Sequence, residues 1–171
     1  MSSKIAKYEG TEITPEDLRR ERYLMTTYHT SLSYAWSSGV ATGKYLAGLK
    51  EGEIWGRRCN GCERTLVPPR MYCEQCFRAT SSWVRLEDRG KVVTYSVSYV
   101  NSDASRRDQP IIVAVIEIAG GSPMMGILHL LGEVAPEKVR VSMEVEAVWK
   151  SQQDREGAIT DIVYFRPRRK E

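Results

Sequence analysis

Four cysteines are the residues with the clearest chemistry in this chain. They form two Cys-x-x-Cys pairs, Cys59 with Cys62 and Cys73 with Cys76, and ten residues separate the pairs. Each pair of this kind forms a tight turn that aims two thiolates at one point, so two turns supply four sulfur ligands in a tetrahedron. This ligand set suits Zn²⁺ at a closed structural site. The spacing therefore predicts a structural zinc ion.

The four cysteines have two other interpretations, disulfides and an iron site. Two disulfides are disfavoured, because a Cys59–Cys62 bond would close a very short, strained loop and nothing else in the sequence indicates secretion. A rubredoxin-like iron centre uses the same four ligands and stays open. All cysteines of the chain belong to the two pairs, so none is left over as a nucleophile.

The rest of the chain is poor in catalytic groups. It has two histidines, His29 in a polar stretch and His129 inside the apolar run 127–131. A lone histidine in such a run is more often structural than a general base. The glycines of segment 119–123 join two expected strands instead of opening a helix, so they do not form a phosphate loop. We predict no catalytic residue in this chain.

Two pairs of arginines are candidate binding residues. Arg57 and Arg58 precede the first cysteine pair, and Arg106 and Arg107 lie in the long polar segment 101–110. A planar guanidinium donates two parallel hydrogen bonds and so suits phosphate groups such as those of coenzyme A. An ordinary solvated arginine is at least as good an interpretation of each one.

Two helices are expected before the cysteines. The first begins at Pro15, with Thr14 as its N-cap and acidic residues in its first turn, and extends to about residue 25. The second is expected over residues 35–50, where apolar side chains recur at helical spacing, and Gly52 is expected to end it.

The second expected helix is also a candidate partner interface. Its aromatic and aliphatic side chains are Trp36, Tyr45, Leu46 and Leu49. Aromatic residues often anchor protein interfaces. The same side chains could instead cover the zinc module or the barrel, and the sequence favours neither interpretation.

The C-terminal half alternates between apolar and polar residues. The clearest strand covers residues 139–147, and further strands are expected at 91–99, 111–118, 124–131 and 158–165. Five strands with no long helix between them predict a small closed barrel, for which the OB-fold is the best match. The expected fold class is therefore mainly β with N-terminal helices, a zinc ribbon and a five-stranded OB-fold barrel.

Length and composition agree with this organisation. The 171 residues are 42% apolar and 27% charged, with a net charge of +3. We place a helical segment at 1–52, the zinc ribbon at 53–82 and the barrel at 83–171. No secretory leader and no membrane-spanning run are recognisable in the sequence, which with the reduced thiols predicts a cytoplasmic protein.

Several short motifs match a known family. YLAGLKEG at residues 45–52, VPPR at 67–70 and GKVVTY at 90–95 occur in this order around the cysteines. Over roughly residues 35–166 the chain resembles the zinc-ribbon plus OB-fold proteins that accompany thiolases and related acyl-CoA enzymes. These include small subunits of bacterial thiolases of anaerobic aromatic degradation. The resemblance implies a rubredoxin-like zinc ribbon followed by an OB-fold.

The resemblance also implies a non-catalytic accessory subunit. Such a chain would dock on a thiolase-fold catalytic subunit in a hetero-oligomer and help to shape its acyl-CoA site, while the partner supplies the reactive cysteine and histidine. The lack of a nucleophile and a base in this chain agrees with that role. The alternative is a single-stranded nucleic-acid-binding module, which the small net charge and the few barrel aromatics disfavour. A rubredoxin-type electron carrier would be far shorter and would need no barrel.

Overall fold

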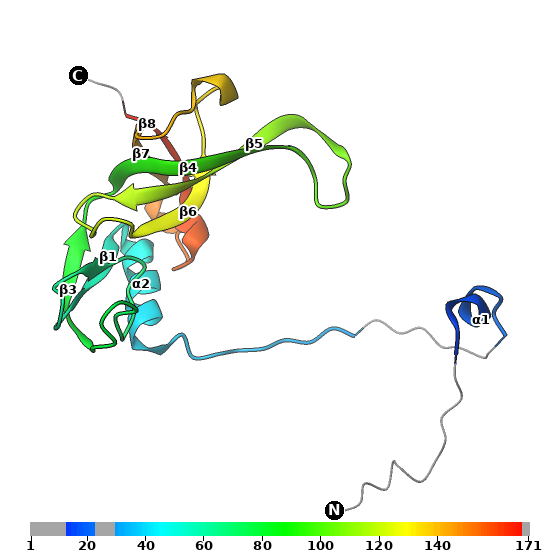
Figure 1. Cartoon of the computed structure of the whole chain (residues 1–171), viewed down its shortest axis with the longest axis horizontal. Coiled ribbons are helices and arrows are strands. Elements are labelled where there is room, and N and C mark those ends of the chain that lie inside the picture. The colour runs from blue at the N-terminus through cyan, green and yellow to red at the C-terminus, as the bar shows by residue number, and fades with distance from the viewer. Residues whose placement is uncertain (1–12, 23–29, 169–171) are drawn as a thin grey trace, which may run out of the picture. The chain divides into compact units, whose positions relative to one another are not determined.

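The structure, a computed structural model, describes residues 13–22 and 30–168. Contacts divide the chain into two compact units, Met1–Trp36 and Ser37–Glu171. The second unit contains one long helix, a small antiparallel sheet and a barrel (Figure 1). Among the helices in the described ranges, none combines the length and the apolar character that crossing a membrane requires.

Helix α1 (Pro15–Arg19) begins as the sequence predicts. The hydroxyl of Thr14 accepts a hydrogen bond from the Asp17 backbone N–H at 3.2 Å, and the Asp17 carboxylate accepts one from the Thr14 N–H at 3.1 Å. This reciprocal pair is a capping box. The helix ends earlier than expected, because Glu21 adopts a φ of 50°, which no α-helix accommodates. Positions 23–29 lie outside the described residues.

Helix α2 (Gly39–Glu51) is shorter at its start than the sequence predicted. Gly39 adopts a φ of 67°, which interrupts helical backbone, and residues 31–38 form no regular structure. Trp36 is therefore not a helical residue, which corrects the expected range of 35–50. At the other end Gly52 has a φ of 78°, so the helix ends in the left-handed glycine cap that the sequence predicted.

The zinc ribbon contributes a three-stranded antiparallel sheet. Its strands are β1 (Ile54–Cys59), β2 (Thr65–Leu66) and β3 (Thr80–Leu86), in the order β2-β1-β3. Strand β3 pairs with β1 as far as Leu86, which lies opposite Ile54. The expected boundary between residues 82 and 83 thus falls inside a strand, and the domain division itself stays a prediction.

Five strands close into the barrel that the sequence predicted. They are β4 (Arg89–Val100), β5 (Arg106–Ile118), β6 (Gly126–Leu131), β7 (Glu144–Trp149) and β8 (Ile162–Pro167). Their order around the barrel is β4-β5-β6-β8-β7, and the first residues of β4 pair with β7 to complete the ring. The β4–β5 hairpin continues beyond the barrel as an arm (Figure 1). The predicted fold class, a zinc ribbon followed by an OB-fold, is confirmed.

Two strands begin four or five residues later than expected. The strand predicted from residue 139 begins at Glu144, because the 3₁₀ helix η2 (Pro136–Lys138) precedes it and Ser142 adopts a φ of 65°. The strand predicted from residue 158 begins at Ile162, after the 3₁₀ helix η4 (Ile159–Asp161). Val139 is buried although it lies outside any strand. The alternation before β7 therefore reports burial at Val139 but not at Val141, which is 58% exposed.

The ribbon, helix α2 and the barrel share one hydrophobic core. The cluster of buried side chains includes Leu49 of α2, Ile54 and Leu66 of the ribbon, and Ile116 and Phe165 of the barrel. Because the three elements bury their apolar faces against one another, the second unit packs as one body around this core.

Candidate metal centre and binding surfaces

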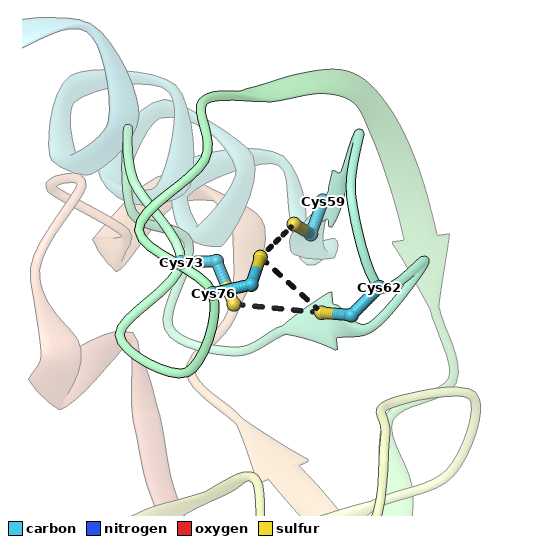
Figure 2. Close-up of side chains that lie close together, drawn as sticks. All are labelled: Cys59, Cys62, Cys73 and Cys76. Atoms are coloured by element: carbon cyan, nitrogen blue, oxygen red, sulfur yellow. Dashed lines mark hydrogen bonds between the residues drawn. The ribbon is translucent and has the colours of Figure 1, made fainter.

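The four cysteine side chains converge on one point (Figure 2). The sulfur atoms lie 3.3 Å apart for Cys59 and Cys76, 3.6 Å for Cys62 and Cys73, and 3.8 Å for Cys62 and Cys76. All four lie within 4.8 Å of one another, and all four thiols are free. Tetrahedral zinc with Zn–S bonds of ~2.3 Å separates its sulfurs by ~3.8 Å. The donor set and its spacing fit Zn²⁺, and the predicted metal site is confirmed.

The two cysteine turns are built alike. The residue after the second cysteine of each pair has a left-handed backbone conformation, with a φ of 58° at Glu63 and 55° at Phe77. The backbone N–H groups of Cys59 and Cys73 donate to the carbonyl five residues later, at 2.8 and 2.9 Å. Each turn is thus closed by its own backbone, which holds the two thiols of a pair on the same side.

Backbone N–H groups lower the pKa of one thiol in each pair. The N–H of Cys62, followed by that of Gly61, lowers the pKa of Cys59 to about 6. The N–H of Cys76 contributes most to lowering the pKa of Cys73. Metals bind the thiolate, so these turns favour the metal-binding form of both residues.

The thiol of Cys62 lies close to the other three sulfur atoms, and its pKa is raised. The N–H of Arg64 lowers the pKa of Cys62, but desolvation and the three neighbouring sulfurs outweigh it and raise that pKa to about 11. Crowded thiolates repel one another, and a divalent cation at their centre removes the repulsion. The site is therefore suited to bind a cation through all four sulfurs.

Arg57 has a structural role instead of the predicted contact with phosphate. Its side chain is buried, and its guanidinium donates to the Thr80 hydroxyl at 2.6 Å and to the Thr80 carbonyl at 3.0 Å. It also lies 4.6 Å from the centre of the Trp83 ring. These contacts use the Nε and Nη2 groups of the buried guanidinium and tie β1 to β3 beside the metal site. The expectation for Arg57 is therefore corrected.

Of the other three candidate arginines, Arg58 and Arg106 are exposed and Arg107 is half-buried. Arg58 forms an exposed ion pair with Glu63 at 3.2 Å. Arg107 donates to the side chain of Asn101 and, at 3.3 Å, to the carbonyl of Gln109. Arg106 is exposed at the start of β5, and its side chain has no partner among the described residues. The β4–β5 turn lies at the far end of the arm from the ribbon (Figure 1), so the two arginine pairs do not form one site.

The expected partner interface on the second helix is not formed as predicted. Tyr45 and Leu49 are only 6% and 1% exposed and belong to the shared core, and Leu46 is half-buried. Helix α2 packs against β1 and η4, so Tyr45 and Leu49 keep almost no surface for a partner. Trp36 alone of the four has a fully accessible side chain, at 85% exposure.

His129 has a structural environment. Its Nε2 lies 3.2 Å from the carbonyl oxygen of Ile159, and its Nδ1 accepts the backbone N–H of Leu130 at 2.9 Å. Both contacts fit one neutral tautomer, with the proton on Nε2. The ring also stands edge-on to Phe165, with centres 5.6 Å apart. Both ring nitrogens are thus engaged, and the Nε2 contact holds β6 to the segment before β8.

Sequence reasoning missed Asp161. This carboxylate is fully buried and accepts three backbone hydrogen bonds, from Glu156 at 3.0 Å, Gly157 at 2.7 Å and Ala158 at 3.0 Å. Lys150 lies 3.9 Å away. The sequence carries one signal of this role, because Gly157 lies four residues before Asp161. An aspartate shortly after a turn residue often accepts hydrogen bonds from the backbone of the same loop.

Comparison with known proteins places the chain in a family. The rubredoxin-like zinc ribbon domain of ChsH2 matches residues 46–81, and the C-terminal OB-fold domain of ChsH2 matches residues 83–150. A DUF35 domain-containing scaffold protein from Methanocaldococcus jannaschii is 33% identical over 115 residues, which are 66% of this chain and 79% of that protein. The chain belongs to the DUF35 family. The resemblance stated from the sequence motifs is thereby confirmed.

Further DUF35 relatives agree. A DUF35 domain-containing scaffold protein from Methanothermobacter thermautotrophicus is 23% identical over 118 residues, 67% of this chain and 86% of that protein. The crystal structure of a DUF35 protein of unknown function from Sulfolobus solfataricus matches with a TM-score of 0.54 and 28% identity, covering 68% of this chain and 81% of that one. The structure described as Ltp2-ChsH2(DUF35) aldolase matches with a TM-score of 0.55 and 23% identity. The match covers 74% of this chain and 94% of that one, and the two share the fold.

Proposed function

We propose that this DUF35 chain is a non-catalytic accessory subunit that docks on the catalytic subunit of a thiolase-type acyl-CoA enzyme. The observation that carries the proposal is how the reactive side chains of the described residues are used. All four thiols converge on the metal site, and both ring nitrogens of His129 are engaged within the fold. A metal-pinned body in which the thiols and the histidine of the described residues are all engaged suits a scaffold.

The relatives support this role. Two of them are named scaffold proteins, and one structural neighbour is described as Ltp2-ChsH2(DUF35) aldolase. We infer a hetero-oligomer in which a thiolase-fold partner supplies the reactive cysteine and histidine. The free thiols of the metal site suit a reducing compartment, and we place the complex in the cytoplasm.

Trp36 is the side chain that we propose as a partner anchor. It lies 6.3 Å from the ring of Tyr34, centre to centre, and both rings are exposed. An exposed aromatic pair is the type of surface that a protein partner covers. Acyl-CoA is proposed to lie near the shared interface, where Arg58, Arg106 and Arg107 are the remaining candidates for its phosphates.

The proposal is tested by capture from cells of the source organism. The tagged full-length chain should retain a thiolase-fold protein in a fixed ratio. Trp36→Ala should lower that ratio at least several-fold with zinc content unchanged, because truncating a central aromatic anchor often costs about 2 kcal/mol. Met124→Ala is the matched control, because Met124 is an equally exposed apolar residue on the β5–β6 turn. Retention of no acyl-CoA enzyme at all would refute the proposal.

A single-stranded nucleic-acid module is the second candidate. The observation in its favour is the β4–β5 hairpin, where Tyr95 and Tyr99 are exposed on β4 and Arg106 is exposed on β5. Exposed aromatics beside a cation can stack on bases. Titration with a fluorescent oligonucleotide would decide this question, since such binding weakens steeply between low and moderate salt. No binding at low salt would exclude it.

A further inference from the structure

A small cavity lies where strands β6 and β8 separate. The two strands pair in parallel only at Leu131 and Phe165, so the part of β6 before Leu131 has no ladder partner on that side. The cavity has a volume of about 160 Å³. Its wall combines Tyr45 and Leu49 of α2 with residues 126–129 of β6, Ile159 and Ile162, and it also includes Pro68 of the ribbon.

Tyr45 is the unusual member of this wall. Only 6% of its surface is exposed, and its hydroxyl has no hydrogen-bond partner among the described residues. Burial raises its pKa to about 12, so the hydroxyl keeps its proton over the whole physiological range. No fully buried side-chain nitrogen or oxygen of the described residues lacks a hydrogen-bond partner, so the unpaired hydroxyl of Tyr45 reaches accessible space. It is therefore free to donate to a group that enters the cavity.

His129 in the same wall is already satisfied. Its ring contacts the Ile159 carbonyl and the Leu130 N–H, so it offers an incoming group nothing but the surface of the ring. The rest of the lining is aliphatic, apart from the backbone of Gly126. The cavity therefore combines an apolar wall with a single available side-chain donor, which is the composition of a specific small-ligand pocket.

The rim and the size of the cavity indicate what would fit. Leu128 and Ile159 line it and are 70% and 64% exposed, so the cavity opens to solvent past apolar side chains. An apolar protein cavity of ~150 Å³ binds benzene. A cavity of about 160 Å³ thus accommodates one six-membered ring or a branched chain of similar size.

We propose that this cavity binds a small organic ligand with one ring-sized apolar group and one hydrogen-bond acceptor, to which the Tyr45 hydroxyl donates. The aliphatic wall selects for the apolar group, and the single donor selects for a carbonyl or ether oxygen. The pocket needs no catalytic partner, so the chain would bind such a ligand whether or not it docks on an acyl-CoA enzyme.

The test uses a pair of probes with the same shape. Cyclohexanone carries an acceptor, whereas methylenecyclohexane replaces that oxygen with a CH₂ group. Each is titrated into the zinc-loaded full-length chain, and methyl NMR signals of Leu128, Ile159 and Ile162 are followed. Both probes should shift these signals saturably, and the ketone should bind several-fold more tightly, as one neutral hydrogen bond provides.

Three variants test whether the probes bind in this cavity and whether the Tyr45 hydroxyl holds the ketone. Tyr45→Phe should lower the affinity for cyclohexanone to that for the hydrocarbon, which should itself change little. Tyr164→Phe removes a hydroxyl that already donates to Glu133 outside the cavity, and should leave both affinities unchanged. Ile159→Trp, at an exposed rim position where folding is not at risk, should abolish binding of both probes. Saturable shifts from neither probe in the wild-type chain, or a ketone preference that survives Tyr45→Phe, would overturn the proposal.

Discussion

The ring of Trp55 lies directly over the α-carbon of Gly48. A Cβ placed on Gly48 would stand 2.3 Å from Trp55 Cδ1 and 3.0 Å from the carbonyl oxygen of Glu53. The ring is held there by a hydrogen bond from its Nε1 to the Glu53 carboxylate at 3.0 Å and by Lys44, 4.4 Å from its centre. Helix α2 can approach strand β1 this closely only because residue 48 has no side chain.

Gly48→Ala should therefore destabilise the second unit. The new methyl group must displace the Trp55 ring or separate α2 from β1, and overpacking of this kind typically costs about 1–3 kcal/mol. Gly43→Ala is the matched control on the same helix, because a Cβ there meets nothing within 4 Å. It should raise stability by roughly 0.5–1 kcal/mol through helix propensity. Urea denaturation of both variants measures the difference, and equal effects would contradict the role of this contact.

Removal of one zinc ligand should affect more than the ribbon. Cys73→Ser should lose the metal and unfold the cysteine turns, since structural zinc contributes folding energy directly. Cys73 and Leu66 belong to the same buried cluster as the barrel side chains, so the barrel should also melt at a lower temperature. Zinc content by elemental analysis and a thermal scan are the measurements. Phe77→Ala, an exposed residue beside a ligand, should keep one zinc per chain.

Arg57→Ala and Arg58→Ala should differ although the residues are neighbours. Arg57 is buried and donates twice to Thr80, so its removal leaves a buried hydroxyl and carbonyl less satisfied and should cost about 2 kcal/mol or more. The Arg58 ion pair with Glu63 is exposed, and such pairs contribute about 0–1 kcal/mol. Chemical denaturation of both variants gives the comparison. A larger loss for Arg58→Ala would show that this account of the ribbon is mistaken.

Asp161 should make the free energy of unfolding depend on pH in the acidic range. Burial acts to raise the pKa of Asp161, but the N–H groups of Glu156, Ala158 and Gly157, with Lys150, overcome it and hold the pKa below its usual value. A carboxyl whose pKa is lower in the folded than in the unfolded state stabilises the protein at neutral pH. That contribution declines as the pH falls below about 4 and is gone below the folded pKa.

Asp161→Asn should therefore be destabilised most at neutral pH. The amide cannot accept all three N–H donors, and the expected loss is about 2–3 kcal/mol at pH 7. The gap to the wild-type chain should narrow as the pH is lowered from 5 to about 3. Asp154→Asn, an exposed position that accepts from Ser151, should show little of either effect. A loss that is constant across this range would mean that charge on Asp161 is irrelevant.

The sequence predicted the features that local chemistry determines. The cysteine spacing predicts the metal site without knowledge of the fold, and Gly52 ends its helix because a left-handed cap requires glycine. Thr14 and Pro15 predict a helix start for a similar reason. Each of these depends on a few neighbouring residues, so no long-range information is needed.

Features that depend on distant contacts could not be predicted in this way. Arg57 looks like a surface cation until β3 brings Thr80 beside it, a partner 23 residues away. Tyr45 looks like an interface residue until the barrel covers it. The cavity beside Tyr45 exists because β6 and β8 diverge, and no pattern within either strand indicates where two strands will separate.

The most direct test of the central claim is a mixing experiment with the catalytic subunit that capture identifies. Three samples at equal concentration are assayed for cleavage of a 3-oxoacyl-CoA and analysed by size-exclusion chromatography: this chain alone, the catalytic subunit alone, and the mixture. An accessory role predicts no turnover by this chain alone. It also predicts one complex in the mixture, with kcat or KM changed several-fold relative to the catalytic subunit alone. Turnover by this chain alone, or a mixture that elutes as two separate proteins with unchanged kinetics, would contradict it.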